Sequence, residues 1–239
     1  FRSADGAVVK TAPRERIVDI NDIPVPAWDL LPPARQYFIQ AQRGCPFSCK
    51  FCMNPGGKFV RHRTAESVID EIRDLAVNYG AKKILYGDEI FTVDLPWTKD
   101  LVRKKIANNL HQLVEWSATT HVRFIDDELC ELMKASNCSG VGLGIETGSE
   151  DHLKKVGKGT TIELMLRARE CTRRANLWTE TFCILGQIDE TLESLKATID
   201  LVIKLNPDLP IFGIMVPYPG TEVARLAAKG QGGYKIVST

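Results

Sequence analysis

Short apolar runs alternate with longer segments of helical periodicity along most of the chain. Residues 64–79 place apolar side chains three and four positions apart, on one helical face, and Gly80 follows as a C-terminal cap. Continued along the chain, this alternation predicts about six strands and five helices. The strands are expected at residues 37–39, 84–86, 113–117, 141–145, 181–185 and 209–216, and the helices at residues 64–79, 96–109, 126–133, 160–175 and 189–205.

Strands that alternate with helices predict right-handed βαβ crossovers and a parallel sheet, so the expected fold class is α/β. Six such units are fewer than the eight of a closed barrel. An open partial barrel and a doubly wound sheet are both compatible with the pattern. In either architecture the ligand site lies at the carboxyl ends of the strands. Residues that directly follow a strand are therefore the first candidates for function.

The first 34 residues have a different texture, with prolines at positions 13, 24, 26, 32 and 33 that favour extended backbone. We expect an extended lead-in over residues 1–34 and a folded core over residues 35–225. Residues 226–239 are expected to begin a truncated C-terminal region. The sequence starts without Met and stops without an obvious ending, so we interpret it as a piece of a longer protein.

Composition narrows the classes of protein. The 239 residues carry 31 basic and 30 acidic side chains and 44% apolar content, enough for one sizeable core. A net charge near zero argues against non-specific binding to nucleic acid or anionic membrane. The longest apolar run, residues 209–216, is far shorter than the about 20 residues of a membrane helix. Seven unevenly spaced cysteines, with no signal peptide, indicate a reducing cytoplasm, where clustered thiols more often bind metal than pair.

Three thiols, those of Cys45, Cys49 and Cys52, form a C-x3-C-x2-C cluster just after the first predicted strand. Thiolates suit zinc and iron–sulfur clusters. A closed zinc site needs a fourth ligand, for which His62 is available between two arginines. A 4Fe–4S cluster on three cysteines instead leaves one iron open for chemistry. Cysteines can also be buried as small hydrophobes, but their position at the predicted active end favours a metal site.

With Phe51 before its last cysteine, this cluster resembles the signature of the radical SAM superfamily, whose fold is a partial (β/α)6 barrel of parallel strands with outer helices. The resemblance covers about residues 35–221. It implies that the three cysteines bind a 4Fe–4S cluster and that the amino and carboxylate groups of S-adenosylmethionine (SAM) chelate the fourth iron. Other segments match family positions that contact SAM: Asp88 and Glu89 for the amino group, Glu146 for the ribose, and Gly186 beside the adenine. Ser117 and Thr119, at the end of the third strand, are further candidates: their hydroxyls either contact SAM or are ordinary strand hydroxyls.

The resemblance implies an enzyme. Reductive cleavage of SAM gives methionine and a 5′-deoxyadenosyl radical, which abstracts hydrogen from an unknown small-molecule or natural-product substrate. The segment Pro217-Tyr218-Pro219-Gly220-Thr221 and the lead-in at residues 22–32 resemble the subgroup with an N-terminal cobalamin-binding domain. That subgroup implies cobalamin, bound by a domain outside this chain, and methyl transfer. The expected partner is an electron donor such as flavodoxin or ferredoxin; catalytic residues beyond the cofactor ligands are not identified.

Two alternatives stay open: a radical SAM enzyme without cobalamin, similar to methylthiotransferases, and a non-catalytic zinc-binding module. Relatives often have Arg and Asp where His121 and Arg123 stand, at a position involved in recognition of the SAM carboxylate. The remaining cysteines, at positions 130, 138, 171 and 183, are predicted to pack in the core. The histidines at positions 62, 111, 121 and 152 are predicted to lie at the surface.

Overall fold

The computed structural model describes residues 2–12, 14–235 and 237, and its centre is a parallel sheet of six strands. Neighbouring strands follow the order β1-β4-β5-β6-β7-β8, and each adjacent pair is parallel. The strands are β1 (Gln36–Ile39), β4 (Lys83–Tyr86), β5 (Glu115–Thr120), β6 (Cys138–Glu146), β7 (Thr179–Leu185) and β8 (Leu209–Ile214). A separate antiparallel pair joins β2 (Gln42–Arg43) to β3 (Arg61–His62).

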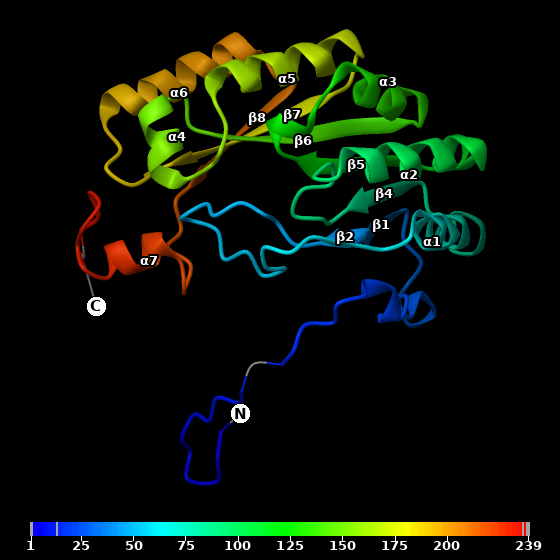
Figure 1. Cartoon of the computed structure of the whole chain (residues 1–239), viewed down its shortest axis with the longest axis horizontal. Coiled ribbons are helices and arrows are strands. Elements are labelled where there is room, and N and C mark those ends of the chain that lie inside the picture. The colour runs from blue at the N-terminus through cyan, green and yellow to red at the C-terminus, as the bar shows by residue number, and fades with distance from the viewer. Residues whose placement is uncertain (1, 13, 236, 238–239) are drawn as a thin grey trace.

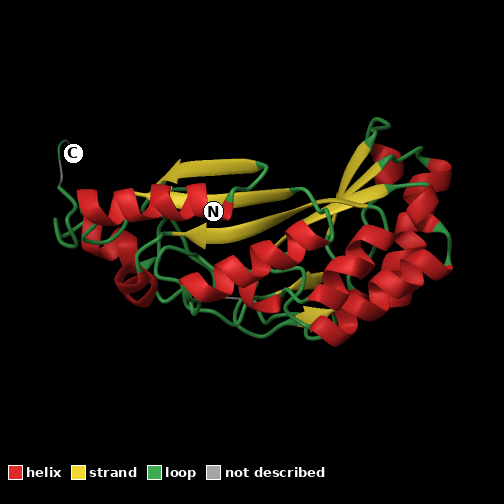
Figure 2. Ribbon diagram, turned by 90° about the horizontal axis from the view of Figure 1, so that it is seen from above, coloured by secondary structure: helices red, strands yellow, loops and turns green. Residues whose placement is uncertain are grey.

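The strand order decides between the two architectures that the sequence left open. A doubly wound sheet reverses its strand order at a switch point, whereas here each strand adds to the same side of the one before it. Right-handed crossovers of this kind place the connecting helices on one face, and Figure 2 shows helices gathered along one side of the strands. The expected α/β fold, a partial barrel with outer helices, is therefore confirmed.

Helices connect the strands, and Figure 1 shows α3, α5 and α6 on the opposite side of the sheet from the segment around β2. The helices are α1 (Ala65–Asn78), α2 (Leu95–Ala107), α3 (Asp127–Ala135), α4 (Glu150–Val156), α5 (Ile162–Arg174), α6 (Leu192–Leu205) and α7 (Glu222–Ala227). Short 3-10 turns span Ile20–Asp22, Trp28–Leu30, Leu110–Gln112 and Val122–Phe124.

Helix α1 illustrates why these residues form these elements. The Thr64 side chain accepts a hydrogen bond from the Ser67 backbone N–H, which satisfies a free donor at the helix start. Val68, Ile72 and Leu75 lie on one face, and all three are fully buried against the sheet. The core also contains the four cysteines outside the triplet, which are buried as predicted.

Some boundaries differ from the sequence prediction. Helix α4, a seven-residue segment rich in charged side chains, was not expected because its apolar stripe is too short to show a period. Helix α5 is capped by Thr161 and begins at Ile162, two residues after the expected start. Helix α6 begins after Thr191, three residues later than expected, because Asp189 adopts a positive φ of 53° that no helix tolerates.

The N-terminal lead-in lies below the body of the molecule in Figure 1 and joins it near β1 and α1. The regular structure among the described residues of the lead-in consists of two short 3-10 turns and one isolated β-bridge, between Arg2 and Val8. In the part of the chain that the structure describes, no helix has both the length and the apolar character needed to cross a membrane.

Candidate cofactor site at the strand ends

The cysteine segment, residues 44–57, is closed by hydrogen bonds within itself and is attached by its backbone to the end of α4. The Cys45 N–H donates to the Gly57 carbonyl oxygen at 2.8 Å, and the Asn54 side-chain amide donates to the Cys45 carbonyl oxygen at 2.8 Å. On the other side, the Lys50 N–H donates to the Val156 carbonyl oxygen at 2.9 Å. The segment is therefore a closed loop that docks onto the C-terminal end of α4.

An aromatic stack completes this docking. The Phe47 ring lies parallel to the His121 ring, with centroids 4.4 Å apart. His121 follows β5 and is almost completely buried, so the surface location predicted for it is wrong; His152 is buried as well. Burial lowers the pKa of His121 to about 4. His121 Nδ1 accepts from the Arg123 N–H, so neutral His121 donates from Nε2 to the Lys158 carbonyl oxygen.

The three triplet thiols line one cavity of about 260 Å³. Cys45 and Cys49 are partly buried, whereas Cys52 is exposed. Burial raises the pKa of Cys49 to about 11 and also raises the pKa of Cys45, while the charge of Lys158 lowers both. Free thiols at these two positions are therefore protonated near neutral pH, and binding a metal would release their protons.

This donor set fits an iron–sulfur cluster by its chemistry. Among the described residues, no group of three or more His, Cys, Asp or Glu side chains is arranged to hold a metal ion. A 4Fe–4S cluster requires a wider arrangement of ligands than a single metal ion does, because each cysteine binds a separate iron at a different corner. The three soft ligands share one cavity wall, as a cluster requires.

Asp88 and Glu89 connect the end of β4 to the cysteine segment. Asp88 Oδ1 accepts from the backbone N–H groups of Ala41 and Gln42, each at 2.9 Å. Its other oxygen, Oδ2, is buried and has no hydrogen-bond partner among the described residues. Glu89 Oε2 accepts from the Gly44 N–H at 3.2 Å. Glu89 therefore positions the start of the cysteine segment, Asp88 positions the residues that lead into it, and Asp88 Oδ2 remains free to accept from a bound donor.

Asp88 also gives the fold a pH dependence. Burial raises its pKa to about 7, against the opposing effect of the Gln42 and Ala41 N–H groups. A carboxyl group with a raised pKa binds its proton more tightly in the folded state, so stability is lost as the pH rises from about 4 to about 7. We expect the free energy of unfolding of the wild type to fall relative to that of Asp88→Asn over this window. Chemical denaturation of both proteins from pH 4 to pH 8 measures the difference, and a difference independent of pH would contradict the assignment.

Glu146 ends β6 in an unusual conformation. Its φ of 66° lies in the left-handed region, at an irregularity in the pairing of β6 with β7. The Gln187 side chain supports this backbone by donating from Nε2 to the Glu146 carbonyl oxygen at 2.8 Å. Glu146 Oε1 pairs with Lys158 Nζ at 2.6 Å, and both residues are buried. Burial, the largest single effect, lowers the pKa of Lys158, but the charge and hydrogen bond of Glu146 together with the charges of Cys49 and Cys45 outweigh it, so the pKa is raised overall.

Four other candidates from the sequence remain, and the structure places them in three different surroundings. Ser117 lines a separate cavity of about 290 Å³ on the sheet, together with Thr119. Gly186 has a φ of 80°, and its N–H donates to the Glu190 carboxylate. Phe51 lies half-buried within the cysteine segment.

Sequence reasoning missed Lys158 and Gln187 and misplaced His121. One signal was present for Lys158, because Gly157 and Gly159 flank it and both have a φ of 69°. A Cβ on Gly159 would lie 3.0 Å from the Phe47 ring, so this glycine permits the close approach of the loop. No comparable pattern marks Gln187.

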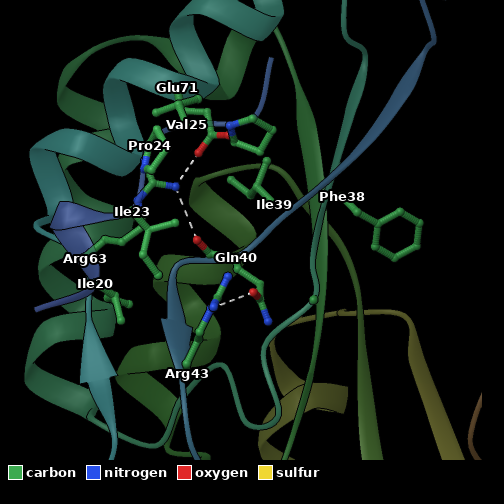
Figure 3. A pocket seen from close by; sticks show the side chains of 12 residues that line it. Ile20, Ile23, Pro24, Val25, Phe38, Ile39, Gln40, Arg43, Arg63 and Glu71 are labelled. Atoms are coloured by element: carbon green, nitrogen blue, oxygen red, sulfur yellow. Dashed lines mark hydrogen bonds and ion pairs between the residues drawn. The ribbon is translucent and has the colours of Figure 1, made fainter. Parts of the chain in front are cut away.

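A further cavity of about 380 Å³ lies between the lead-in and the edge strand β1. Figure 3 shows Arg63 beside its wall, bonded to Gln40 and paired with Glu71. The Trp28 indole N–H donates to the other oxygen of Glu71 at 3.1 Å. This buried network attaches the lead-in to α1 and to the end of β1.

The fold and the site together define a class: a parallel α/β partial barrel with clustered thiols and buried carboxylates at the carboxyl ends of its strands. Residues 39–202 match the model of the radical SAM superfamily, and the chain belongs to that superfamily. Its cofactors are a 4Fe–4S cluster and SAM, and this membership favours an enzyme over a zinc-binding module.

Relatives and solved structures agree with this placement. An uncharacterized methyltransferase of Pyrococcus horikoshii is 32% identical over 92% of this chain and 49% of its own length. The anaerobic magnesium-protoporphyrin IX monomethyl ester cyclase of Rubrivivax gelatinosus is 28% identical over 93% of this chain and 42% of its own. The chain thus spans about half the length of these relatives.

Among solved structures, the radical SAM methyltransferase TsrM from Kitasatospora setae has a TM-score of 0.75 at 22% identity, over 82% of this chain and 39% of TsrM. That structure holds tryptophan and a SAM analogue. The coproporphyrinogen III oxidase of Escherichia coli has a TM-score of 0.61 at 17% identity, over 81% of this chain and 47% of its own. These likenesses support the fold.

Proposed function

We propose that this chain is the catalytic core of a radical SAM enzyme. The observation that carries the proposal is that the three triplet thiols line one cavity, in a segment held by the Glu89 carboxylate, in a chain of this superfamily. When bound, the cluster and SAM supply reductive cleavage to methionine and a 5′-deoxyadenosyl radical that abstracts hydrogen from substrate. The protein orients these groups and excludes water.

Each candidate residue has a proposed role. Cys45, Cys49 and Cys52 bind three irons, and Phe51 packs beside them. The partnerless Asp88 Oδ2 accepts from the SAM amino group, because an ammonium there offsets the cost of burying the carboxylate. Three further contacts to SAM are proposed: Glu89 beside the amino group, Ser117 on the sheet, and the Gly186 backbone beside the adenine. Glu146 hydrogen-bonds the ribose through the oxygen that Lys158 leaves free.

The reaction that we propose is cobalamin-dependent methyl transfer to a small molecule in the cytoplasm. Several relatives are named as methyltransferases, among them the tryptophan 2-C-methyltransferase of Streptomyces laurentii. In this proposal residues 1–34 follow a cobalamin-binding domain, residues 35–225 form the core, and residues 226–239 begin a C-terminal region. A flavodoxin or ferredoxin supplies the electron.

Anaerobic reconstitution tests the enzyme proposal. We expect about four irons and four sulfides per chain with a broad brown absorbance. With dithionite, the reconstituted protein should convert SAM to 5′-deoxyadenosine. One tightly held zinc without colour would instead show a binding module.

A second measurement tests the cobalamin proposal on the full-length protein. We expect it to bind cobalamin and to transfer the SAM methyl group to a substrate. A full-length protein that cleaves SAM and does not retain cobalamin would support the alternative, an enzyme similar to methylthiotransferases.

A further inference from the structure

A buried ion pair lies near enough to the cysteine segment for both of its charges to act on Cys49. Lys158 Nζ and Glu146 Oε1 are 2.6 Å apart, and less than a tenth of either residue is exposed. An added Cβ on Gly144 would lie 2.6 Å from this Nζ and 2.8 Å from this Oε1, so the missing side chain at Gly144 leaves the space that the pair fills. The pair is therefore built into the site rather than placed at its surface.

The backbone around Lys158 is fixed against the cysteine segment at three points. Its carbonyl oxygen accepts from buried His121, whose ring stacks on Phe47 between Cys45 and Cys49. On either side, Gly157 lies beneath the Ser48 carbonyl oxygen and Gly159 beneath the Phe47 ring. This arrangement holds the Lys158 side chain in one place relative to the thiols.

Such a pair needs an explanation other than stability. The cost of taking two charges out of water often equals or exceeds the gain from pairing them, so a buried ion pair is weak evidence for stabilisation. The electrostatic effect of Lys158 reaches both Cys45 and Cys49, and at Cys49 it exceeds the opposite effect of Glu146. Lys158 is therefore the strongest single charge acting on Cys49, whereas at Cys45 the opposing effect of Cys52 is larger.

Three further cations lie near the cysteine segment. Lys50 and Lys58 line the same cavity as the thiols, and Lys58 donates to the Ser48 hydroxyl at 2.6 Å. Arg123 lies over the Phe47 ring and donates to the Gly159 carbonyl oxygen.

We propose that Lys158 is a positioning residue that sets the reduction potential of the iron–sulfur cluster, with Glu146 limiting its effect. The inference rests on the proposed function. Three thiolates give the oxidised cluster a net negative charge, and reduction adds another electron. A fixed cation in a site of low dielectric lowers the cost of that added charge, so it raises the potential. The carboxylate of Glu146 keeps the cation charged and opposes part of this effect.

Potentiometric titration of the reconstituted protein without SAM, followed by the electron paramagnetic resonance signal of the reduced cluster, tests the proposal. In Lys158→Met we expect the ratio of reduced to oxidised cluster at a fixed potential to fall about tenfold, which is about 59 mV for one electron. Glu146→Gln should shift the ratio in the opposite direction. The double variant, which buries no charge, should shift it in the direction of Lys158→Met by a smaller amount. Lys158→Arg and the exposed control Lys154→Met should stay within about twofold of the wild type.

The outcomes separate the two proposals. A wild type that binds no cluster would overturn both the function and this inference. A wild type that binds a cluster and cleaves SAM, with Lys158→Met and Glu146→Gln both at the wild-type potential, would overturn this inference alone. If Lys158→Met assembles no cluster, the direction in which the reduction potential shifts in Glu146→Gln and in the double variant decides whether the inference holds.

Discussion

We expect the Cys49→Ala variant to bind no iron–sulfur cluster. Iron falls from about four per chain to near zero after anaerobic reconstitution, and SAM cleavage falls to background. The physical reason is the number of protein ligands. A structural cluster is held by four thiolates, and the cluster proposed here by only three. With two, the cluster would have two iron corners without a protein ligand. Iron and sulfide analysis, together with 5′-deoxyadenosine formation, measures the effect.

Cys171→Ala is the matched control. Cys171 is buried in α5, away from the triplet, and alanine suits a helix. This variant should keep the iron content of the wild type and unfold at a slightly lower temperature. Full iron content and SAM cleavage in Cys49→Ala would refute the assignment of the cluster to the triplet.

Much of the fold could be predicted because its signals are local. The strands and long helices show hydrophobic periods, and the order of elements along the chain implies the parallel sheet. The choice between a partial barrel and a doubly wound sheet was not local, since it depends on which strands pair. Helix α4 escaped prediction because seven residues with four charged side chains near their start and end carry too little pattern.

The candidate site was predictable only where its chemistry is concentrated in sequence. The triplet and the Asp88-Glu89 pair stand out as motifs. His121 was expected at the surface because single histidines with polar neighbours usually lie there. Its burial follows from the docking of a segment about 75 positions earlier in the chain, a contact that no local pattern reveals. Lys158 is similar, because its partner Glu146 is placed by the end of β6 and not by spacing along a helix.

These misplaced residues share one property. Each lies next to the cysteine segment: the His121 ring stacks on Phe47, and the two glycines that flank Lys158 closely approach Ser48 and Phe47. The closed loop thus creates the low-dielectric environment that gives these side chains their effect. The arrangement of the whole site therefore depends on whether the cysteine segment can adopt its closed conformation.

Gly44→Ala should prevent that closure. Gly44 has a φ of 109°, and an added Cβ would overlap the Phe59 carbonyl oxygen and lie 3.2 Å from the Gly57 carbonyl oxygen. Because Gly44 directly precedes Cys45, relief of the collision moves the first cluster ligand. We expect iron content to fall by more than half and the free energy of unfolding to fall by about 2–5 kcal/mol, the combined cost of backbone strain and overpacking. Gly80→Ala, also at positive φ but with open space around it, should cost only about 1–2 kcal/mol and keep its iron. Equal iron content in Gly44→Ala and Gly80→Ala, measured beside their denaturation curves, would show that the collision at Gly44 does not control the site.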